Sequence, residues 1–178
     1  MTKATPDFVH KLVFLGDSSV GKTSLVQRYV YNSLDPNIGR TIGAMLHVKL
    51  VQYEDALHKL VIWDLGGQQS FHVLREQYCA KASGAFFVVD ITRPDTLESI
   101  DSWLGDLYNA AGKVPVVIVE NKVDLEPAIP QDKIVQEAES RGFKLITTSA
   151  LENRNVNQAF TGLLIEVVKK AKEKKAII

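Results

Sequence analysis

Residues 16–23 read Gly16-Asp17-Ser18-Ser19-Val20-Gly21-Lys22-Thr23, and the architecture of the chain can be built outward from them. They lie between an apolar run, residues 11–15, and residues 25–30, whose apolar side chains recur at helical spacing. A strand, a glycine-bounded loop and a helix in this order make the pattern GxxxxGK[ST] a prediction of a phosphate-binding loop. Small residues let backbone N–H groups curve around an oligophosphate, and the helix points its positive N-terminal end at the same anion. We therefore expect a nucleotide site here rather than an ordinary glycine turn.

Two side chains of this loop have predicted roles in chemistry. Lys22 supplies a mobile cation for the outer phosphates, and the Thr23 hydroxyl is a hard oxygen suited to Mg²⁺. The residues expected to surround the phosphates are Ser18, Ser19, Val20, Gly21, Lys22, Thr23 and Ser24.

The composition fits one ordinary α/β domain. The chain has 178 residues and is 46% hydrophobic, so it can fill a core, and we expect residues 1–178 to form a single domain. Its one cysteine, Cys79, excludes an intramolecular disulfide and a cysteine-rich zinc cluster. A formal net charge of zero argues against a broad nucleic-acid surface. With neither an apolar signal core nor a membrane-length apolar run, we expect a soluble, cytoplasmic protein.

Apolar runs alternate with helical patterns along the chain, which predicts an α/β fold with a doubly wound, mostly parallel sheet between two helical layers. The predicted strands are residues 8–15, 44–53, 57–63, 84–91, 114–119 and 143–147. The first helix fades at Asn32, and the others cover residues 71–82, 97–111, 131–141 and 156–171. Because only Glu54-Asp55-Ala56 separates the second and third strands, these two form a hairpin with an antiparallel edge strand. Ligands of such sheets bind beyond the carboxyl ends of the strands.

The strand over residues 57–63 is followed by Asp64-Leu65-Gly66-Gly67-Gln68. Asp64 is predicted to hold Mg²⁺ through water, as a Walker-B carboxylate does. Gly67 has no Cβ, so its N–H can approach a γ-phosphate, and the Gln68 amide can orient an attacking water. Alone this is also the pattern of a plain glycine-rich turn, but downstream of a phosphate loop it becomes specific.

A further motif, Asn121-Lys122-Val123-Asp124, decides which base is bound. The Asp124 carboxylate accepts two hydrogen bonds from guanine, whereas adenine would leave it buried and unpaired. Asn121 ties loops together, and the Lys122 stem covers the face of the base. The backbone N–H groups expected near guanine O6 belong to Ser149, Ala150 and Leu151. A solvated loop is the alternative for this motif on its own.

At this point the chain resembles the Ras-superfamily small GTPases over nearly its whole length. GDSSVGKT, RTIG, DLGGQ, NKVD and TSA are similar to the five nucleotide motifs of that family, in family order. GDSSVGKTSLVQRYV and TIGA look most like the Rab branch, and WDLGGQ looks more like the Arf branch.

The resemblance implies binding of GTP or GDP with Mg²⁺ and slow GTP hydrolysis in which Gln68 and Lys22 take part. It also implies that the Thr41 hydroxyl completes the metal site of Thr23 and Asp64. Effectors, exchange factors and GTPase-activating proteins are expected to read two nucleotide-sensing switch segments, near residues 34–43 and 65–78.

Some positions depart from the family pattern. Leu34 stands where the family usually has an aromatic ring against the base, so we expect weaker nucleotide retention. Gly66 and Gln69 replace the Ala and Glu that Ras and Rab proteins usually carry, which alters switch II. The chain has no C-terminal cysteine, and Met1-Thr2 lacks the glycine needed for myristoylation, so no lipid anchor is expected in it.

The same motifs also allow other functions. An ATP-dependent P-loop kinase or ATPase shares the first motif but has no need of NKVD. A nucleotide-bound scaffold would carry the same motifs without switching. Arg40, beside Thr41, is either an arginine that assists hydrolysis from within the chain or a solvated loop charge.

Overall fold

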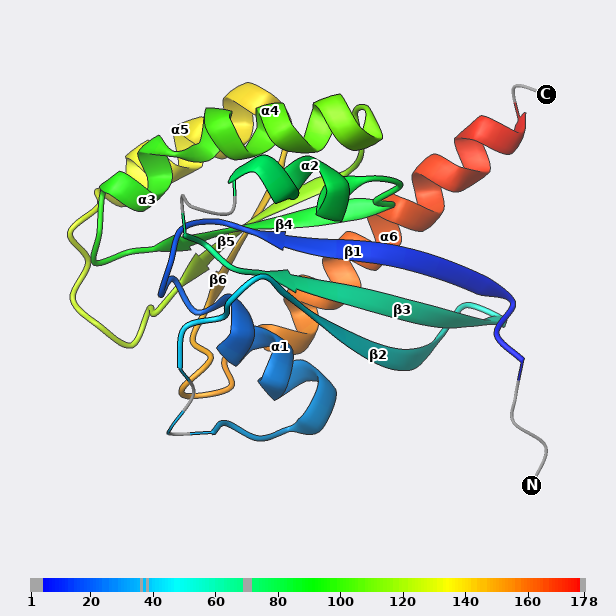
Figure 1. The fold of residues 1–178 in the computed structure, drawn as a ribbon, viewed down its shortest axis with the longest axis horizontal. Coiled ribbons are helices and arrows are strands. Elements are labelled where there is room, and N and C mark those ends of the chain that lie inside the picture. Colours follow the sequence, from blue (N-terminus) through cyan, green and yellow to red (C-terminus); the bar gives the residue numbers. More distant parts are fainter. Residues whose placement is uncertain (1–4, 36, 38, 69–71, 177–178) are drawn as a thin grey trace.

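Six strands form one sheet within residues 5–35, 37, 39–68 and 72–176, which the computed structural model describes. The strands are β1 (Phe8–Leu15), β2 (Ala44–Tyr53), β3 (Ala56–Leu65), β4 (Gly84–Asp90), β5 (Val116–Asn121) and β6 (Lys144–Thr148). They lie in the order β2-β3-β1-β4-β5-β6 (Figure 1). β2 runs antiparallel to β3 and every other neighbouring pair is parallel, which confirms the predicted sheet and its antiparallel edge.

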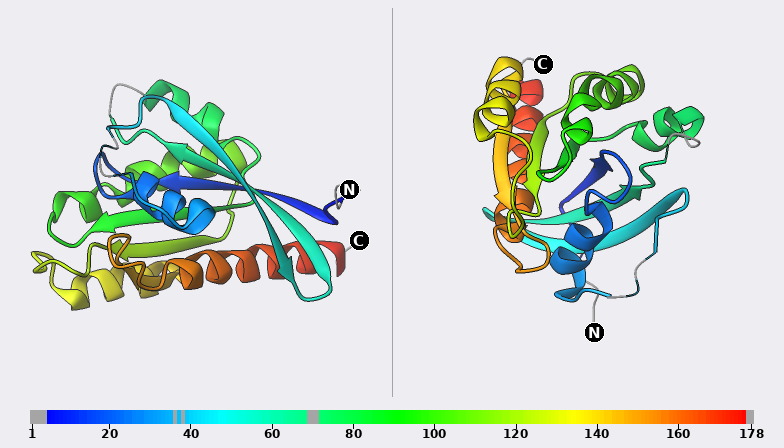
Figure 2. Two further views of the ribbon diagram at one scale, coloured as in Figure 1. Left: turned by 90° about the horizontal axis from the view of Figure 1, so that it is seen from below. Right: turned by 90° about the vertical axis from the view of Figure 1, so that its left-hand side faces the viewer.

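Helices cover both faces of this sheet. They are α1 (Lys22–Tyr31), α2 (His72–Cys79), α3 (Asp95–Glu98), α4 (Ile100–Ala111), α5 (Gln131–Arg141) and α6 (Val156–Ala176). In Figure 1, α2, α3, α4 and α5 lie above the sheet and α1 lies below it, and the left panel of Figure 2 looks onto the face that carries α1 and α6. The predicted three-layer arrangement is therefore confirmed.

The alternation of side chains along β1 explains the two layers. Leu12 and Phe14 pack into a core with residues of α1 and α6, whereas Val13 and Leu15 pack into a second core with residues of α4 and α5. All four are at most 1% exposed, as expected for a strand that is covered on both faces.

Aromatic stacking fixes α1 and α6 on their face. The rings of Tyr29 in α1 and Phe160 in α6 are parallel within 6°, with centroids 3.6 Å apart. Phe160 also packs against Phe14 and Phe86 of the sheet, with ring centroids 5.5 and 4.9 Å apart. The C-terminal half of α1, which follows the loop after β1, is thus packed firmly against α6 and the sheet.

Several element boundaries differ from the prediction. The helix predicted over residues 97–111 is divided into α3 and α4 at Ser99, whose ψ of −3° breaks the α-helical course. β5 begins at Val116, after Pro115, instead of at residue 114, and it ends at Asn121 instead of at residue 119. α2 ends at Cys79 rather than at residue 82, because Lys81 has a left-handed backbone with φ 59°.

Smaller differences concern the hairpin turn, the end of α6 and the start of α2. The turn between β2 and β3 has two residues, with Glu54 at φ 52°, so Ala56 already pairs in β3. α6 continues to Ala176, beyond the apolar stripe that ends at residue 171. Phe71, the predicted start of α2, lies outside the described residues, as does Gln69.

The thiol of Cys79 is fully buried in the core between the sheet and α4. Burial raises its pKa to about 12, and the nearby Asp106 carboxylate acts in the same direction. The thiol therefore stays protonated at neutral pH.

Two histidines form a buried pair between β1 and β3. Nε2 of His10 lies 2.8 Å from Nδ1 of His58, and the two residues are 7% and 2% exposed. Burial lowers the pKa of His10 below the ordinary 6.5, and the charge of His58 lowers it further. The fold therefore favours the neutral form of His10.

We expect acid to destabilise the protein through this pair. As the pH falls below about 6.5, the unfolded chain takes up a proton at position 10 that the folded chain refuses, so the free energy of unfolding decreases until the lower, folded-state pKa is reached. Urea denaturation at about pH 7.5 and about pH 5.5 measures this loss, and His10→Asn should reduce it because the amide does not titrate. An equal loss in both proteins would contradict this assignment.

Candidate functional site

The loop between β1 and α1 depends on two glycines. Gly16 and Gly21 have φ angles of 127° and 102°, a region that residues with side chains rarely adopt. A Cβ at Gly16 would lie 2.5 Å from the carbonyl oxygen of Val88, and one at Gly21 would lie 2.2 Å from Nδ2 of Asn121. The loop is thus closed down onto β4 and β5, and α1 begins directly after it, so that the helix N-terminus completes an anion cradle.

The ammonium group of Lys22 lies inside this loop. Its Nζ donates to the carbonyl oxygens of Gly16 and Asp17, at 2.6 and 2.7 Å, and the residue is 6% exposed. Burial lowers the pKa of Lys22 to about 8, against the opposite effect of the Asp64 and Asp17 carboxylates. A phosphate bound in the loop would favour the charged form of this amine.

Three predicted metal ligands meet at the edge of the loop. Thr23 Oγ1 donates to Asp64 Oδ2 at 2.5 Å and lies 2.7 Å from Thr41 Oγ1, which also donates to Asp64 Oδ2, at 3.4 Å. Oδ1 of Asp64 is buried and has no hydrogen-bond partner among the described residues. Burial raises the pKa of Asp64, and the hydrogen bond from Thr23 and the charge of Lys22 oppose this rise.

These oxygens fit a magnesium ion. They are hard donors, and an added cation would satisfy the unpaired Asp64 oxygen and favour the ionised carboxylate. Among the described residues, no three His, Cys, Asp or Glu side chains gather into a metal-binding cluster. Mg²⁺ is usually held by one or two protein side chains together with phosphates and water, and the oxygens of Thr23, Thr41 and Asp64 suit that kind of site.

The glycines that follow Asp64 allow a close approach of three backbone segments. A Cβ on Gly67 would lie 2.2 Å from the carbonyl carbon of Asp17, and one on Gly66 would lie 2.6 Å from the carbonyl oxygen of Thr41. The Gly66 N–H also donates to the carbonyl oxygen of Gly43 at 2.7 Å. The end of β3 thus lies directly against the phosphate loop and against residues 41–43.

These segments line a cavity of about 290 Å³ that is open to solvent on one side. The residues that line it are Ser18, Ser19, Gly21, Lys22, Thr23, Ser24, Gly39, Arg40, Thr41, Leu65, Gly67 and Lys122. Most residues predicted to hold phosphate and metal are therefore brought together. Gln68 is half-buried and follows Gly67, but its side chain is not among the described ones that line the cavity. Arg40 is exposed and does line it.

Asn121 joins the phosphate loop to the two strand ends beside it. Its Nδ2 donates to the carbonyl oxygen of Val20 at 2.9 Å. Its Oδ1 accepts from Thr148 Oγ1 at 3.0 Å and from the Ala150 N–H at 3.4 Å. This is the loop-tying contact that the sequence predicts for it.

The predicted base-recognition residues lie together at the carboxyl ends of β5 and β6. Ser149 Oγ donates to Asp124 Oδ1 at 2.5 Å, so one carboxylate oxygen has a fixed direction. Arg28 of α1 donates to the carbonyl oxygens of Ala150 and Leu151, at 2.8 and 2.9 Å, and so fixes the loop that follows β6.

Comparison with known proteins agrees with this geometry. A sequence model of the Ras family matches residues 11–169. The chain belongs to the Ras family. This Ras-family chain is 35% identical over 164 residues to the Ras-related protein RABA2a of Arabidopsis thaliana, covering 90% of this chain and 76% of that protein. It is 37% identical over 153 residues to mouse Rab-22A (84% and 79% covered) and 34% identical over 171 residues to rab-11.1 of Caenorhabditis elegans (94% and 81%).

The Ras-family chain is thus a Rab-like small GTPase, an enzyme that acts as a switch in trafficking or signalling. Members of this family in general bind guanine nucleotide and Mg²⁺ and interact with effectors, exchange factors and activating proteins. No helix among the described residues is both long enough and apolar enough to cross a bilayer.

Some contacts of this Ras-family site are not foreseen from the sequence. Lys122, with φ 69°, donates to Asp90 Oδ2 at 2.5 Å, and Asp90 also holds Thr92 through two hydrogen bonds. Despite burial, these hydrogen bonds lower the pKa of Asp90. Arg93 donates to the carbonyl oxygen of Ser18 at 2.8 Å and so supports the phosphate loop from the β4 side. Only the position of Asp90 at a strand end could have indicated such a role.

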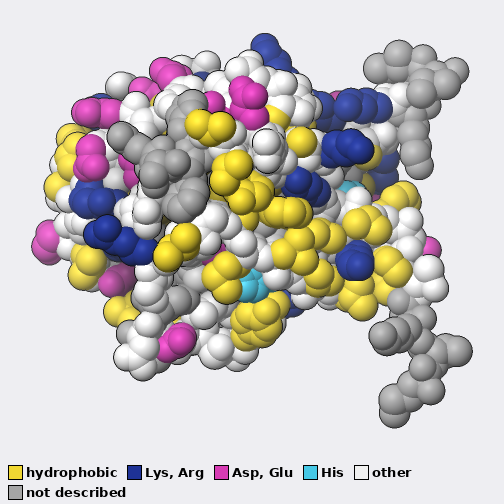
Figure 3. All heavy atoms as spheres, in the orientation of Figure 1, with side chains coloured by type: hydrophobic (Ala, Val, Ile, Leu, Met, Phe, Trp, Pro, Cys, Tyr) yellow, Lys and Arg dark blue, Asp and Glu magenta, His cyan; other side chains and the backbone are white. Residues whose placement is uncertain are grey.

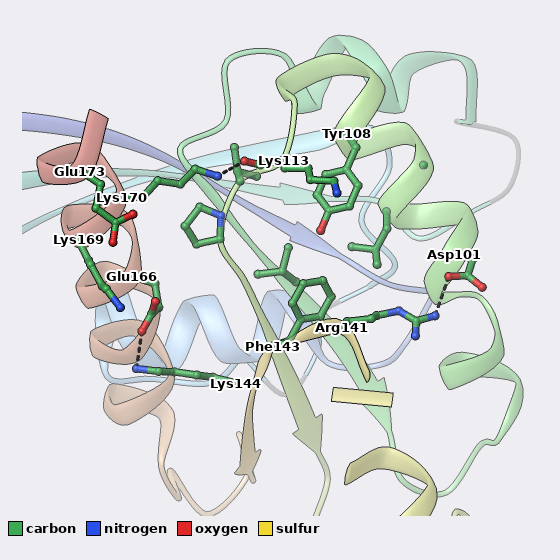
Figure 4. A pocket seen from close by; sticks show the side chains of 16 residues that line it. Asp101, Tyr108, Lys113, Arg141, Phe143, Lys144, Glu166, Lys169, Lys170 and Glu173 are labelled. Carbon is green, nitrogen blue, oxygen red and sulfur yellow. Dashed lines mark hydrogen bonds and ion pairs between the residues drawn. The ribbon is translucent and has the colours of Figure 1, made fainter. Parts of the chain in front are cut away.

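A larger hollow, of about 840 Å³, lies at the opposite edge of the sheet, where β5 and β6 begin (Figure 4). Charged side chains that line this hollow form ion pairs with one another: Arg141 with Asp101 at 2.7 Å, and Lys144 with Glu166 at 2.8 Å. None of the described nucleotide motifs lines it. The smaller cavity at the carboxyl ends is therefore the candidate functional site, because it holds the chemically matched groups.

We expect Gly66→Ala, which restores the residue usual in Ras and Rab proteins, to disturb the contact with residues 41–43. The added methyl would overpack against the Thr41 carbonyl, which costs about 1–3 kcal/mol of unfolding free energy. Urea denaturation and faster amide hydrogen exchange in residues 39–46 would report it. Gly105→Ala is the control, because a Cβ there meets no atom within 4 Å. Equal behaviour of the two variants would show that Gly66 has no such role.

Proposed function

We propose that this GTPase binds GTP and GDP with Mg²⁺, with the phosphates and the metal in the 290 Å³ cavity, and slowly hydrolyses GTP, with residues 1–178 acting as one domain. The observation that carries the proposal is the meeting of Thr23, Thr41 and Asp64 beside the phosphate loop. Thr23 belongs to the helix after the loop and Thr41 to a separate segment, so a shared cation would draw that segment onto the nucleotide.

In the proposed mechanism, backbone N–H groups of residues 18–23 and the Lys22 ammonium bind the phosphates, and Thr23, Thr41 and Asp64 would hold the metal. When bound, Mg²⁺ would neutralise charge that builds up on the phosphates. The Gly67 N–H meets the γ-phosphate, and Gln68 orients the water that attacks it in line. Two contacts depend on the γ-phosphate in this scheme: the one that Thr41 would make through the metal and the one made by the Gly67 N–H. When the γ-phosphate is lost both contacts are lost, and the segments around Thr41 and Gly67 relax.

Guanine is the proposed base. One Asp124 oxygen is oriented by Ser149, which supports a carboxylate held in place to pair with N1–H and N2–H₂ of guanine. The proposed contacts to the base and its surroundings are completed by Asn121, Lys122, Ala150 and Leu151. An ATP-dependent enzyme would gain nothing from this acceptor, because adenine presents no matching donors.

Partners are proposed to read residues 34–43 and 65–78, the two segments tethered by the γ-phosphate. Ile42 and Val73, one in each segment, are 77% and 82% exposed. Figure 3 shows hydrophobic side chains gathered over β2 and β3, next to these segments. Exposed apolar area of this kind favours protein partners over nucleic acid. The chain is proposed to act in the cytoplasm, with membrane contact only where an anchor or a partner supplies it.

The direct test is extraction of nucleotide from purified protein, followed by single-turnover hydrolysis with Mg²⁺. GTP or GDP should be recovered, GTP should outcompete ATP, and hydrogen exchange in residues 34–43 should differ between the two guanine nucleotides. Recovery of adenine nucleotides would refute guanine selectivity, and identical exchange would point to a scaffold that does not switch.

Gln68→Leu should slow hydrolysis by about 10- to 100-fold, because the attacking water loses its orienting amide. GTP affinity should stay nearly unchanged, since Gln68 is not proposed to bind the ground state. Gln77→Leu on the exposed face of α2 is the control and should retain the rate. Parallel losses of rate and affinity in Gln68→Leu would contradict the assigned role.

Asp124→Asn should exchange guanine for xanthine preference. An amide donates to the xanthine C2 carbonyl but repels the guanine amino group, so GTP affinity should fall by about 10²-fold or more. Competition between GTP and XTP measures the exchange, with Asp132→Asn on the surface of α5 as control. A variant that still strongly prefers GTP would overturn the proposed recognition of the base.

A further inference from the structure

A buried arginine anchors the switch II helix α2 to its neighbour α4. Arg75 is 4% exposed, and its guanidinium carbon lies 3.5 Å from the centroid of the Trp103 ring. Its Nη1 lies 3.4 Å from Oδ2 of Asp106, one turn farther along α4. A cation so deeply buried is stable only with such partners, so these contacts fix where α2 can lie.

The same tryptophan reaches the phosphate loop. Trp103 Nε1 donates to Oδ1 of Asp17 at 3.0 Å. The indole ring is therefore held between the guanidinium of Arg75 on its face and a carboxylate of the phosphate loop at its edge. Asp17 is connected to α2 by two consecutive contacts, both of them directional.

Asp17 is also contacted by the other end of the switch II segment. The backbone of Gly67 lies so near that a Cβ there would come within 2.2 Å of the Asp17 carbonyl carbon. Gly67 and Arg75 are thus both connected to Asp17 of the phosphate loop, Gly67 directly and Arg75 through Trp103. Gln68 follows Gly67 directly in the chain.

From this arrangement we propose that Arg75 is a positioning residue for GTP hydrolysis. It restricts α2 relative to the phosphate loop, and since α2 follows Gln68 in the chain, Gln68 is presented to the attacking water with less conformational freedom. The inference rests on the proposed function, in which Gln68 orients that water. Arg75 touches neither nucleotide nor water in this scheme and acts through the position of α2.

The alternative is that Arg75 only packs α2 against α4. A packing role and a positioning role differ in what they change: the first lowers stability, whereas the second lowers the hydrolysis rate of protein that is still folded and loaded with GTP. The two are separated by comparing Arg75 with Arg141, which also forms an ion pair with an α4 carboxylate, Asp101, at 2.7 Å, but far from the phosphate loop.

The experiment is single-turnover hydrolysis by protein preloaded with GTP, together with GTP affinity, for the wild type, Arg75→Met and Arg141→Met. We expect Arg75→Met to hydrolyse GTP about tenfold more slowly with GTP affinity within about twofold of the wild type, and Arg141→Met to match the wild type in both. A wild-type rate in Arg75→Met, or an equal slowing in Arg141→Met, overturns the proposal.

Trp103→Phe provides a second test that keeps an aromatic ring under the guanidinium but removes the N–H that binds Asp17. It should also slow hydrolysis, and amide exchange in α2 of the GTP-bound form should become faster. An unchanged rate in Trp103→Phe refutes the connection through Asp17, even if Arg75→Met is slow. Absence of GTP hydrolysis by the wild type would instead refute the proposed function itself, so the two failures are distinguishable.

Discussion

A carboxylate that is buried loses its hydration, and hydrogen bonds or a cation must replace it. The Asp64 carboxylate at the end of β3 is such a group. Its residue is fully buried, one oxygen accepts hydrogen bonds from Thr23 and Thr41, and the other has no partner among the described residues. The hydroxyls belong to α1 and to the segment before β2, so one charge brings three parts of the chain together. Removing either hydroxyl would leave more of that charge unpaired, which explains why the segments converge.

The central part of the site could be predicted from the sequence because it is local. The phosphate loop, the strand before it and the helix after it are continuous in the chain, and only Gly fits at positions 16 and 21. The sheet could also be predicted, because strands covered on both faces have continuous apolar runs in the sequence. Asp64, Asn121 and Ser149 each follow an apolar run in the sequence, which places them at strand ends, and parallel strands bring such ends to one edge of the sheet.

The contacts that were not predicted join residues far apart in the chain. Arg93 supports Ser18, Trp103 binds Asp17, and Arg75 lies over Trp103, and each pair is decided by how helices settle on the sheet. From the sequence alone, Trp103 is simply a large residue suited to a core. Boundaries such as the break at Ser99 are equally decided by local backbone geometry, which a hydrophobic pattern does not record.

The burial of Cys79 has a practical consequence. A thiol whose pKa is raised to about 12 has almost no thiolate at neutral pH, and only the thiolate reacts with maleimides or iodoacetamide. Since the chain contains no other cysteine, the native sequence already serves as an unreactive background for labelling. A fluorophore or spin label attached to an introduced surface cysteine would report on one chosen position, without the need to replace a core residue first.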